Sequence, residues 1–198
     1  MKKQFLMLSG LLFIPISIAE VVTGTDELAQ LPFWELRTQA MTFRLVQRLP
    51  DQTRAYFSGR GFAKKDVDAI AGYCFFQSVY TNTASANSQH IIEHDASQWR
   101  IDYANKEQPL VLREDWRGIW EKRGVNNAQK IAFEWSLLPT RQRYQPTDYN
   151  WGMTAYKLPH GAQFNLKISW TLNGVAKHAV IKNIRCAKDI YIPPAGNQ

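Results

Sequence analysis

The clearest pattern of hydrophobic and polar positions lies near the C-terminal end of the chain. In the stretch QFNLKISWTL, every second residue from Phe164 to Leu172 is apolar, and the residues between them are polar. Such alternation places one set of side chains on the buried face of a β-strand. Asn173 and Gly174 follow, and this pair is typical of a two-residue hairpin turn. The pattern therefore predicts a β-hairpin that continues into the residues after Gly174.

Other stretches also favour strands. The segment CFFQSVYTN begins at Cys74 and is rich in aromatic and β-branched residues. The segments QHIIEHD and QWRIDYA flank a short turn, and the second alternates cleanly. In KIAFEWSLL, the apolar positions are Ile131, Phe133, Trp135 and Leu137. We therefore predict several antiparallel strands separated by short turns.

Helical spacing appears in four places. Between residues 28 and 49, apolar side chains recur every three or four positions, which predicts a helix that ends at Pro50. A short helix capped by Asp51 and a third helix over residues 63–72 follow. In LREDWRGIWEKRG, two tryptophans share one helical face, and the acidic start and basic end suit the helix dipole.

These elements predict a mainly β protein with a helical N-terminal segment. The predicted architecture is an immunoglobulin-like antiparallel β-sandwich, with a partly open barrel as the alternative. Cys74 and Cys186 are the two cysteines of the chain, and an even count in an exported protein favours a disulfide. The sequence contains neither a glycine-rich phosphate loop nor a serine nucleophile elbow.

The N-terminus matches a secretory signal peptide, because Lys2 and Lys3 precede a short apolar run that ends at Ala19. That run is shorter than the roughly 20 residues of a membrane span, and charges interrupt the later apolar runs. We predict export to the periplasm and no membrane span. The predicted divisions are a signal peptide (1–19), a helical N-terminal segment (20–73), a disulfide-tied β-sandwich (74–192) and a flexible tail (193–198).

Charge adds little to this picture. The 198-residue chain carries a formal net charge of +7, and removal of Lys2 and Lys3 with the signal peptide leaves +5. The remaining basic residues are scattered along the sequence. Without a dense basic patch or a known motif, the sequence does not favour nucleic-acid binding.

The stretch YNWGMTAYKLPHG carries the candidate binding residues Tyr149, Trp151, Met153 and His160. An exposed aromatic loop is suited to recognise a glycan or a protein, although aromatic residues also fill β-sheet cores. Met153 and His160 offer a thioether and an imidazole, which suit copper if His178 or Met41 contributes as well. The structural alternative is a core methionine and a surface histidine on a turn.

Two further groups of residues raise chemical possibilities. His90 and His94 have the spacing of zinc ligands on a helix, but their segment is predicted to be a strand. On a strand they would lie roughly 13 Å apart and act as ordinary surface histidines. Carboxylate pairs for polymer hydrolysis are drawn from Glu93, Asp95, Asp102, Glu114 and Asp115.

Export, a disulfide and the lack of a recognisable catalytic set together predict a non-catalytic binding or accessory protein of the bacterial envelope. Its partner is expected to be another envelope protein or a glycan. We predict no catalytic residue, no metal and no cofactor. The alternatives are a periplasmic copper-handling protein and a hydrolase that acts on an envelope polymer.

Overall fold

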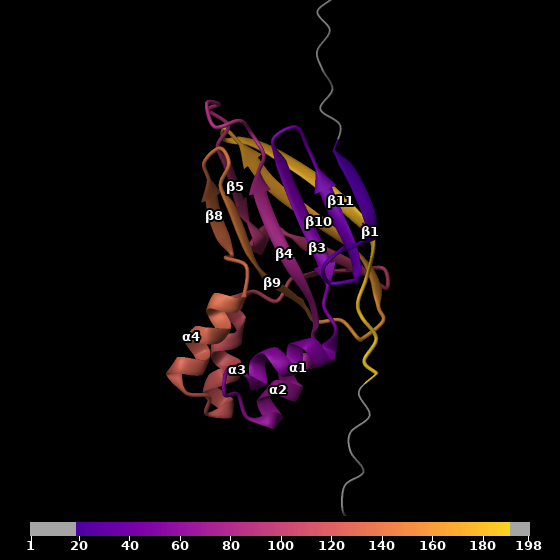
Figure 1. Ribbon diagram of the computed structural model, residues 1–198, viewed down its shortest axis with the longest axis vertical. Coiled ribbons are helices and arrows are strands. Elements are labelled where there is room, and N and C mark those ends of the chain that lie inside the picture. The colour runs from indigo at the N-terminus through magenta and orange to yellow at the C-terminus, as the bar shows by residue number, and fades with distance from the viewer. Residues whose placement is uncertain (1–18, 191–198) are drawn as a thin grey trace, which may run out of the picture.

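A computed structural model describes residues 19–190 of the chain. The predicted signal peptide, apart from Ala19, and the predicted tail at 193–198 lie outside the described residues. The described part is mainly β, with strands arranged in two antiparallel sheets. Figure 1 shows the sheets layered one behind the other, with the α-helices grouped at one end.

The first sheet, sheet A, has five strands in the order β1-β2-β3-β4-β9. Each strand is antiparallel to its neighbour. Its strands are β1 (Glu20–Thr25), β2 (Pro32–Arg37), β3 (Met41–Gln47), β4 (Cys74–Asn82) and β9 (Tyr149–Tyr156).

The second sheet, sheet B, is built around its long strand β10, which pairs with β11 along one side and with β5 and β6 along the other. The outer strands β8 and β7 pair with β5 and β6, respectively. The predicted hairpin is present, because Asn173 and Gly174 both have positive φ between β10 and β11. Its strands are β5 (Ile92–Asp95), β6 (Arg100–Tyr103), β7 (Lys106–Pro109), β8 (Arg141–Tyr144), β10 (Gln163–Leu172) and β11 (Val175–Arg185).

The main hydrophobic core lies between the two sheets. Phe43 and Phe76 of sheet A belong to the same buried cluster as Leu166 of sheet B. Cys74, at the start of β4, forms a disulfide with Cys186, just after β11, and their Cα atoms lie 5.6 Å apart. The predicted bridge is therefore present, and it joins sheet A to the end of sheet B.

A second core lies between the helices and part of the outer face of sheet A. Trp116, Trp120 and Phe133 of the helices pack with Phe75 and Met153 of the sheet. The helices are α1 (Pro50–Ser58), α2 (Lys64–Ala71), α3 (Trp116–Arg123) and α4 (Asn127–Ser136), with 3-10 turns at Ala96–Gln98 and Arg113–Asp115.

The prediction of a helical segment at 20–73 was wrong for its first half. Residues 20–47 form three strands, and β3 pairs with β4 over its length. A tight turn separates β2 from β3, in which Thr38 Oγ1 accepts hydrogen bonds from the Met41 and Ala40 backbone N–H groups. This turn shifts the alternation of buried and exposed positions by one residue between β2 and β3. As a result, the apolar residues of the two strands recur every three or four positions, as they would in a single helix. The two short helices after Pro50 are present, and Pro50 begins α1 rather than ending a helix.

The prediction of a strand in KIAFEWSLL was also wrong, because Asn127–Ser136 forms α4. Asn126 and Gln129 make a reciprocal capping box, in which each side-chain oxygen accepts from the other residue's backbone N–H. Such a box satisfies two backbone donors at the helix start. The described strands form two separate antiparallel sheets and no closed barrel.

Candidate functional site

The large aromatic side chains that remain exposed within residues 19–190 gather near strand β9. They are Trp135, Tyr149 and Trp151, with exposed fractions of 82%, 67% and 58%. Tyr149 and Trp151 are two positions apart on β9, so their side chains leave the same outer face of sheet A. The predicted aromatic loop is therefore the first half of an edge strand.

A groove of about 470 Å³ lies on the same outer face of sheet A as Tyr149 and Trp151. We call it the waist groove, because it runs where sheet A meets the helices. It is lined by the β1–β2 loop, the outer faces of β3 and β4, and the start of α1. The side chains used below are Arg44, Val46, Arg48, Gln77 and Val79. Val79 pairs with Trp151 in the register of β4 and β9, so the aromatic face continues into the groove.

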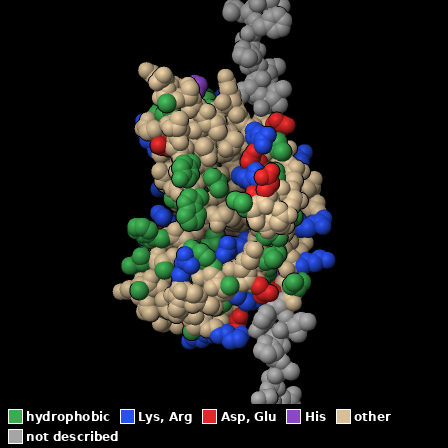
Figure 2. Space-filling model, viewed as in Figure 1, with side chains coloured by type: hydrophobic (Ala, Val, Ile, Leu, Met, Phe, Trp, Pro, Cys, Tyr) green, Lys and Arg blue, Asp and Glu red, His purple; other side chains and the backbone are tan. Residues whose placement is uncertain are grey.

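Trp135 belongs to the same region through the end of α4. The residue after it, Ser136, is within hydrogen-bond distance of the hydroxyl of Tyr56 on α1 (Oγ to Oη, 3.0 Å). Two residues later, the Leu138 backbone N–H donates to the Met153 carbonyl on β9 at 2.9 Å. Figure 2 shows hydrophobic side chains spread over this face, with basic side chains among them where the sheet meets the helices.

The arginines of the groove differ in their partners. Arg44 forms ion pairs with Asp26 at 2.8 Å and Glu35 at 3.0 Å. Arg48 has no carboxylate within ion-pair distance among the described residues, and its Nη2 donates only to the Gln52 carbonyl at 3.1 Å. Burial lowers the pKa of Arg48, because desolvation disfavours the charged form and the neighbouring Arg60 repels it. The groove therefore contains one arginine that is neutralised by carboxylates, Arg44, and one arginine without a counterion, Arg48.

Met153 and His160, the suggested copper ligands, lie in different surroundings. Met153 points from β9 into the helix-side core. His160 lies beyond the end of β9, where its Nε2 is 2.9 Å from the Ala71 carbonyl and its Nδ1 is 3.7 Å from an Asp189 carboxylate oxygen. Neither residue joins the exposed rings of Tyr149 and Trp151.

The other residues suggested for metal binding are also dispersed. Met41 is buried between the sheets, whereas His178 is exposed on β11. His94 was predicted to be a surface residue, which was wrong: it is 3% exposed and packs against Tyr80 and Trp99. Its place on β5 turns it inward, and burial lowers its pKa. Within residues 19–190, no three His, Cys, Asp or Glu side chains are grouped as metal ligands would be.

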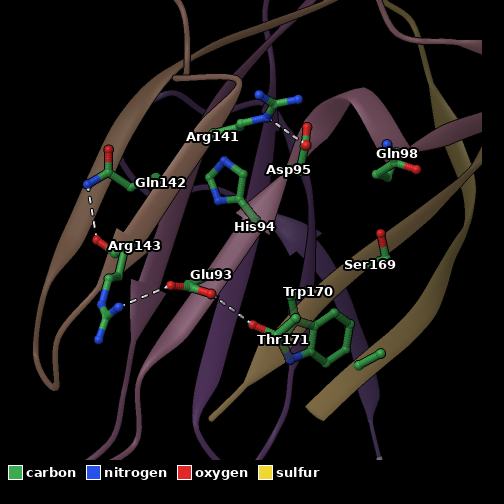
Figure 3. A pocket seen from close by; sticks show the side chains of 11 residues that line it. Glu93, His94, Asp95, Gln98, Arg141, Gln142, Arg143, Ser169, Trp170 and Thr171 are labelled. Carbon is green, nitrogen blue, oxygen red and sulfur yellow. Dashed lines mark hydrogen bonds and ion pairs between the residues drawn. The ribbon is translucent and has the colours of Figure 1, made fainter. Parts of the chain in front are cut away.

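A second pocket, of about 540 Å³, lies over sheet B and contains Glu93 and Asp95 (Figure 3). Asp95 accepts hydrogen bonds from Arg141 Nε at 2.7 Å and from the Ser97 backbone N–H, and these contacts outweigh burial and lower its pKa. Glu93 is 3.4 Å from Arg143 Nη1. Because each carboxylate has an arginine partner, this pocket has little unbalanced charge, and a low pKa is unsuited to a general acid.

The remaining candidate carboxylates are engaged in structural contacts. Asp102 pairs with Lys167 at 3.1 Å. Glu114 interacts with Thr140 and Arg113, which lower its pKa despite partial burial. Asp115 accepts from the Leu112 backbone N–H at 2.8 Å. These contacts explain all three residues without a catalytic role.

Comparison of the chain with family models, with curated proteins and with solved structures gives no match. Among the helices formed within residues 19–190, none has the length and apolar character to cross a membrane.

Tyr149 and Trp151 were predicted from the sequence as candidate binding residues, whereas Trp135 and Arg48 were not. Trp135 was assigned to a strand, where it would share a face with the buried Phe133. The capping residues Asn126 and Gln129 were the signal that would have identified the helix. Arg48 carries no comparable signal, because a missing counterion is a property of three-dimensional packing.

Proposed function

We propose that this protein is an exported, non-catalytic binding module whose partner, a glycan or another protein of the bacterial envelope, lies across the aromatic face and the waist groove. The observation that carries the proposal is the exposure of Trp135, Tyr149 and Trp151 beside a groove, while other large rings fill the two cores. Exposed apolar surface of this kind is characteristic of interaction sites.

The cellular setting belongs to the same proposal. The disulfide between Cys74 and Cys186 is compatible with an oxidising compartment, and the N-terminal pattern supports export through a signal peptide. We also propose that the two sheets form a β-sandwich of immunoglobulin-like type, which is supported by the shared core between them.

The test compares wild-type protein with the double variant Tyr149→Ala/Trp151→Ala. Retention is measured on a panel of immobilised envelope polysaccharides, and neighbouring envelope proteins are identified by crosslinking in cells. Val175→Ala/Val180→Ala is the matched control, because both valines are exposed on β11 of the other sheet.

We expect the aromatic double variant to lose at least tenfold in affinity for the partner that wild-type protein binds, because one buried aromatic contact is commonly worth more than 1.4 kcal/mol. The valine variant is expected to bind like wild type. Equal binding by the aromatic variant would contradict the proposal, as would a wild-type protein that binds no member of either panel. Melting curves check that both variants are folded.

A further inference from the structure

The waist groove contains a cation that the fold leaves unneutralised. The Nε atom of Arg48 is buried without a hydrogen-bond partner among the described residues. Its guanidinium carbon lies 5.0 Å from the centre of the Tyr56 ring. A buried donor without a partner is costly for the free protein, and the guanidinium group that carries it lines the groove with its charge unneutralised.

A second cation reinforces the first. The Arg60 guanidinium carbon lies 3.3 Å from the centre of the same Tyr56 ring, so the two guanidinium carbons lie no more than about 8 Å apart. Arg60 has no carboxylate within ion-pair distance among residues 19–190, and its Nη1 donates to the Tyr56 carbonyl at 3.1 Å. Two arginines without counterions around one ring favour an anionic ligand.

The polar lining of the groove adds an acceptor to these cations. Gln77, on the outer face of β4, donates from Nε2 to the Gly152 carbonyl at 3.3 Å. This bond uses the amide nitrogen, and the described residues donate no hydrogen bond to the amide oxygen. Free amide oxygens accept hydrogen bonds from hydroxyl groups. The groove thus suits a ligand that carries both anionic groups and hydroxyl donors.

The edge of β9 gives little room for an extended peptide. The Leu138 N–H donates to the Met153 carbonyl, and the Val111 N–H donates to the Ala155 carbonyl. These bonds occupy the outer edge of the second half of β9. Because adding a strand depends on a row of free backbone groups, recognition at this edge falls to the side chains of Tyr149 and Trp151.

We infer that the ligand of the waist groove is an acidic carbohydrate chain, whose carboxylate is bound by Arg48 with Arg60 beside it and whose sugar rings lie against Trp151 and Tyr149. This inference rests on the proposed binding function and specifies the class of ligand. Arginine and carboxylate form strong, charge-assisted pairs, and the aromatic faces supply flat apolar surfaces for the rings.

The experiment uses hexasaccharides of galacturonate and of mannuronate, together with the same chains after reduction of their carboxyl groups to alcohols. A hexapeptide of glutamate serves as an acidic peptide. Binding to the oxidised protein is measured by calorimetry and by tryptophan fluorescence, at low and at high salt. We expect at least one acidic hexasaccharide to bind at least tenfold more tightly than its reduced form and than the peptide.

Arg48→Gln is the decisive variant, and Arg143→Gln is its control. Both remove one positive charge, but Arg143 lies on the outer face of sheet B and interacts with Glu93. We expect Arg48→Gln to weaken binding of the acidic chain at least tenfold and to leave its melting temperature unchanged or raised. Arg143→Gln is expected to bind like wild type. A purely structural Arg48 would instead lower the melting temperature without a selective effect on acidic chains.

The outcomes separate this inference from the proposed function. Equal affinity for acidic and reduced chains, stronger binding of the peptide, or no binding of either acidic chain would overturn the inference. The proposed function would survive those results if Tyr149→Ala/Trp151→Ala still weakened binding to another envelope partner. Full affinity in Arg48→Gln would also overturn the inference.

Discussion

Gly152 provides the sharpest test of how β9 and the helices fit together. A Cβ atom added there would lie 2.6 Å from the Leu137 carbonyl carbon and 2.8 Å from Leu138 Cα, and still closer to the Leu138 nitrogen. These are backbone atoms, which cannot move aside by rotating a side chain. The same segment donates the Leu138 N–H to the Met153 carbonyl. Gly152→Ala therefore forces β9 away from the chain that leaves α4.

The cost follows from two contributions. Overpacking in a closely packed region commonly costs about 1–3 kcal/mol, and a weakened backbone hydrogen bond adds about 0.5–1.5 kcal/mol. Alanine has a smaller conformational entropy than glycine in the unfolded chain, and this difference offsets about 0.4–1 kcal/mol of the destabilisation. We therefore expect Gly152→Ala to lower the free energy of unfolding by about 2–3 kcal/mol, or roughly 5–10 °C in melting temperature.

Urea unfolding with the disulfide intact measures this change, and Gly118→Ala is its matched control. Gly118 lies in α3, and an added Cβ would meet no atom within 4 Å. Alanine is favoured over glycine inside a helix by about 0.5–1 kcal/mol, so the control should be stabilised. If Gly152→Ala stayed within about 0.5 kcal/mol of wild type while Gly118→Ala gained stability, the close approach of the two chains would be refuted.

Three further predictions concern the cores and the disulfide. Replacing Cys74 and Cys186 with alanine should cost about 4–5 kcal/mol in urea unfolding, because the bridge spans a separation of 112 residues; a loss under about 1 kcal/mol would contradict this. Burial lowers the pKa of His94 from its ordinary value of 6.5. As the pH falls, His94 is therefore protonated in the unfolded state before it is protonated in the folded state. Stability should fall below about pH 6.5, by up to about 1.4 kcal/mol per pH unit, and His94→Phe should reduce this slope; an unchanged slope would show that His94 is not its source. Trp120→Ala on α3 should cost about 3–5 kcal/mol and Trp135→Ala on α4 under about 0.5 kcal/mol in the same assay, because their exposed fractions are 1% and 82%; equal costs would mean that Trp135 is buried as Trp120 is.

The part of the fold that follows from sequence is the part with long, unambiguous alternation. β4 and the β10–β11 hairpin are where the pattern predicts them, and so is the disulfide. α3 is also where predicted, and Gly124 ends it in the left-handed conformation. In each case the local spacing of apolar residues and a turn or cap residue favour the same element, and this element is also the one that the tertiary structure contains.

The wrong predictions of secondary structure occurred where the spacing of apolar residues fits both the period of a helix and the period of a strand. Leu36 and Phe43 match a helix in sequence, but the turn at Thr38 places them on paired strands, where they are register partners. In α4 the error went the other way: Phe133 and Trp135 alternate as in a strand, but as neighbours two apart on a helix they point in nearly opposite directions. One ring is consequently buried and the other exposed. Because the secondary structure was predicted wrongly, the exposure of Trp135 was not predicted either.

The site itself arises from incomplete coverage of one sheet face. Along β9, Met153 and Ala155 are covered by the helices, whereas Tyr149 and Trp151, on the same face, are exposed. On β4 the same boundary falls between the buried Phe75 and the partly exposed residues that follow it on that face. The waist groove begins at this boundary, so the packing of α1 and α4 against the sheet fixes the position of Arg48 relative to the rings. Since no continuous stretch of sequence contains both sides of the groove, its chemistry depends on the contact between layers rather than on any one motif.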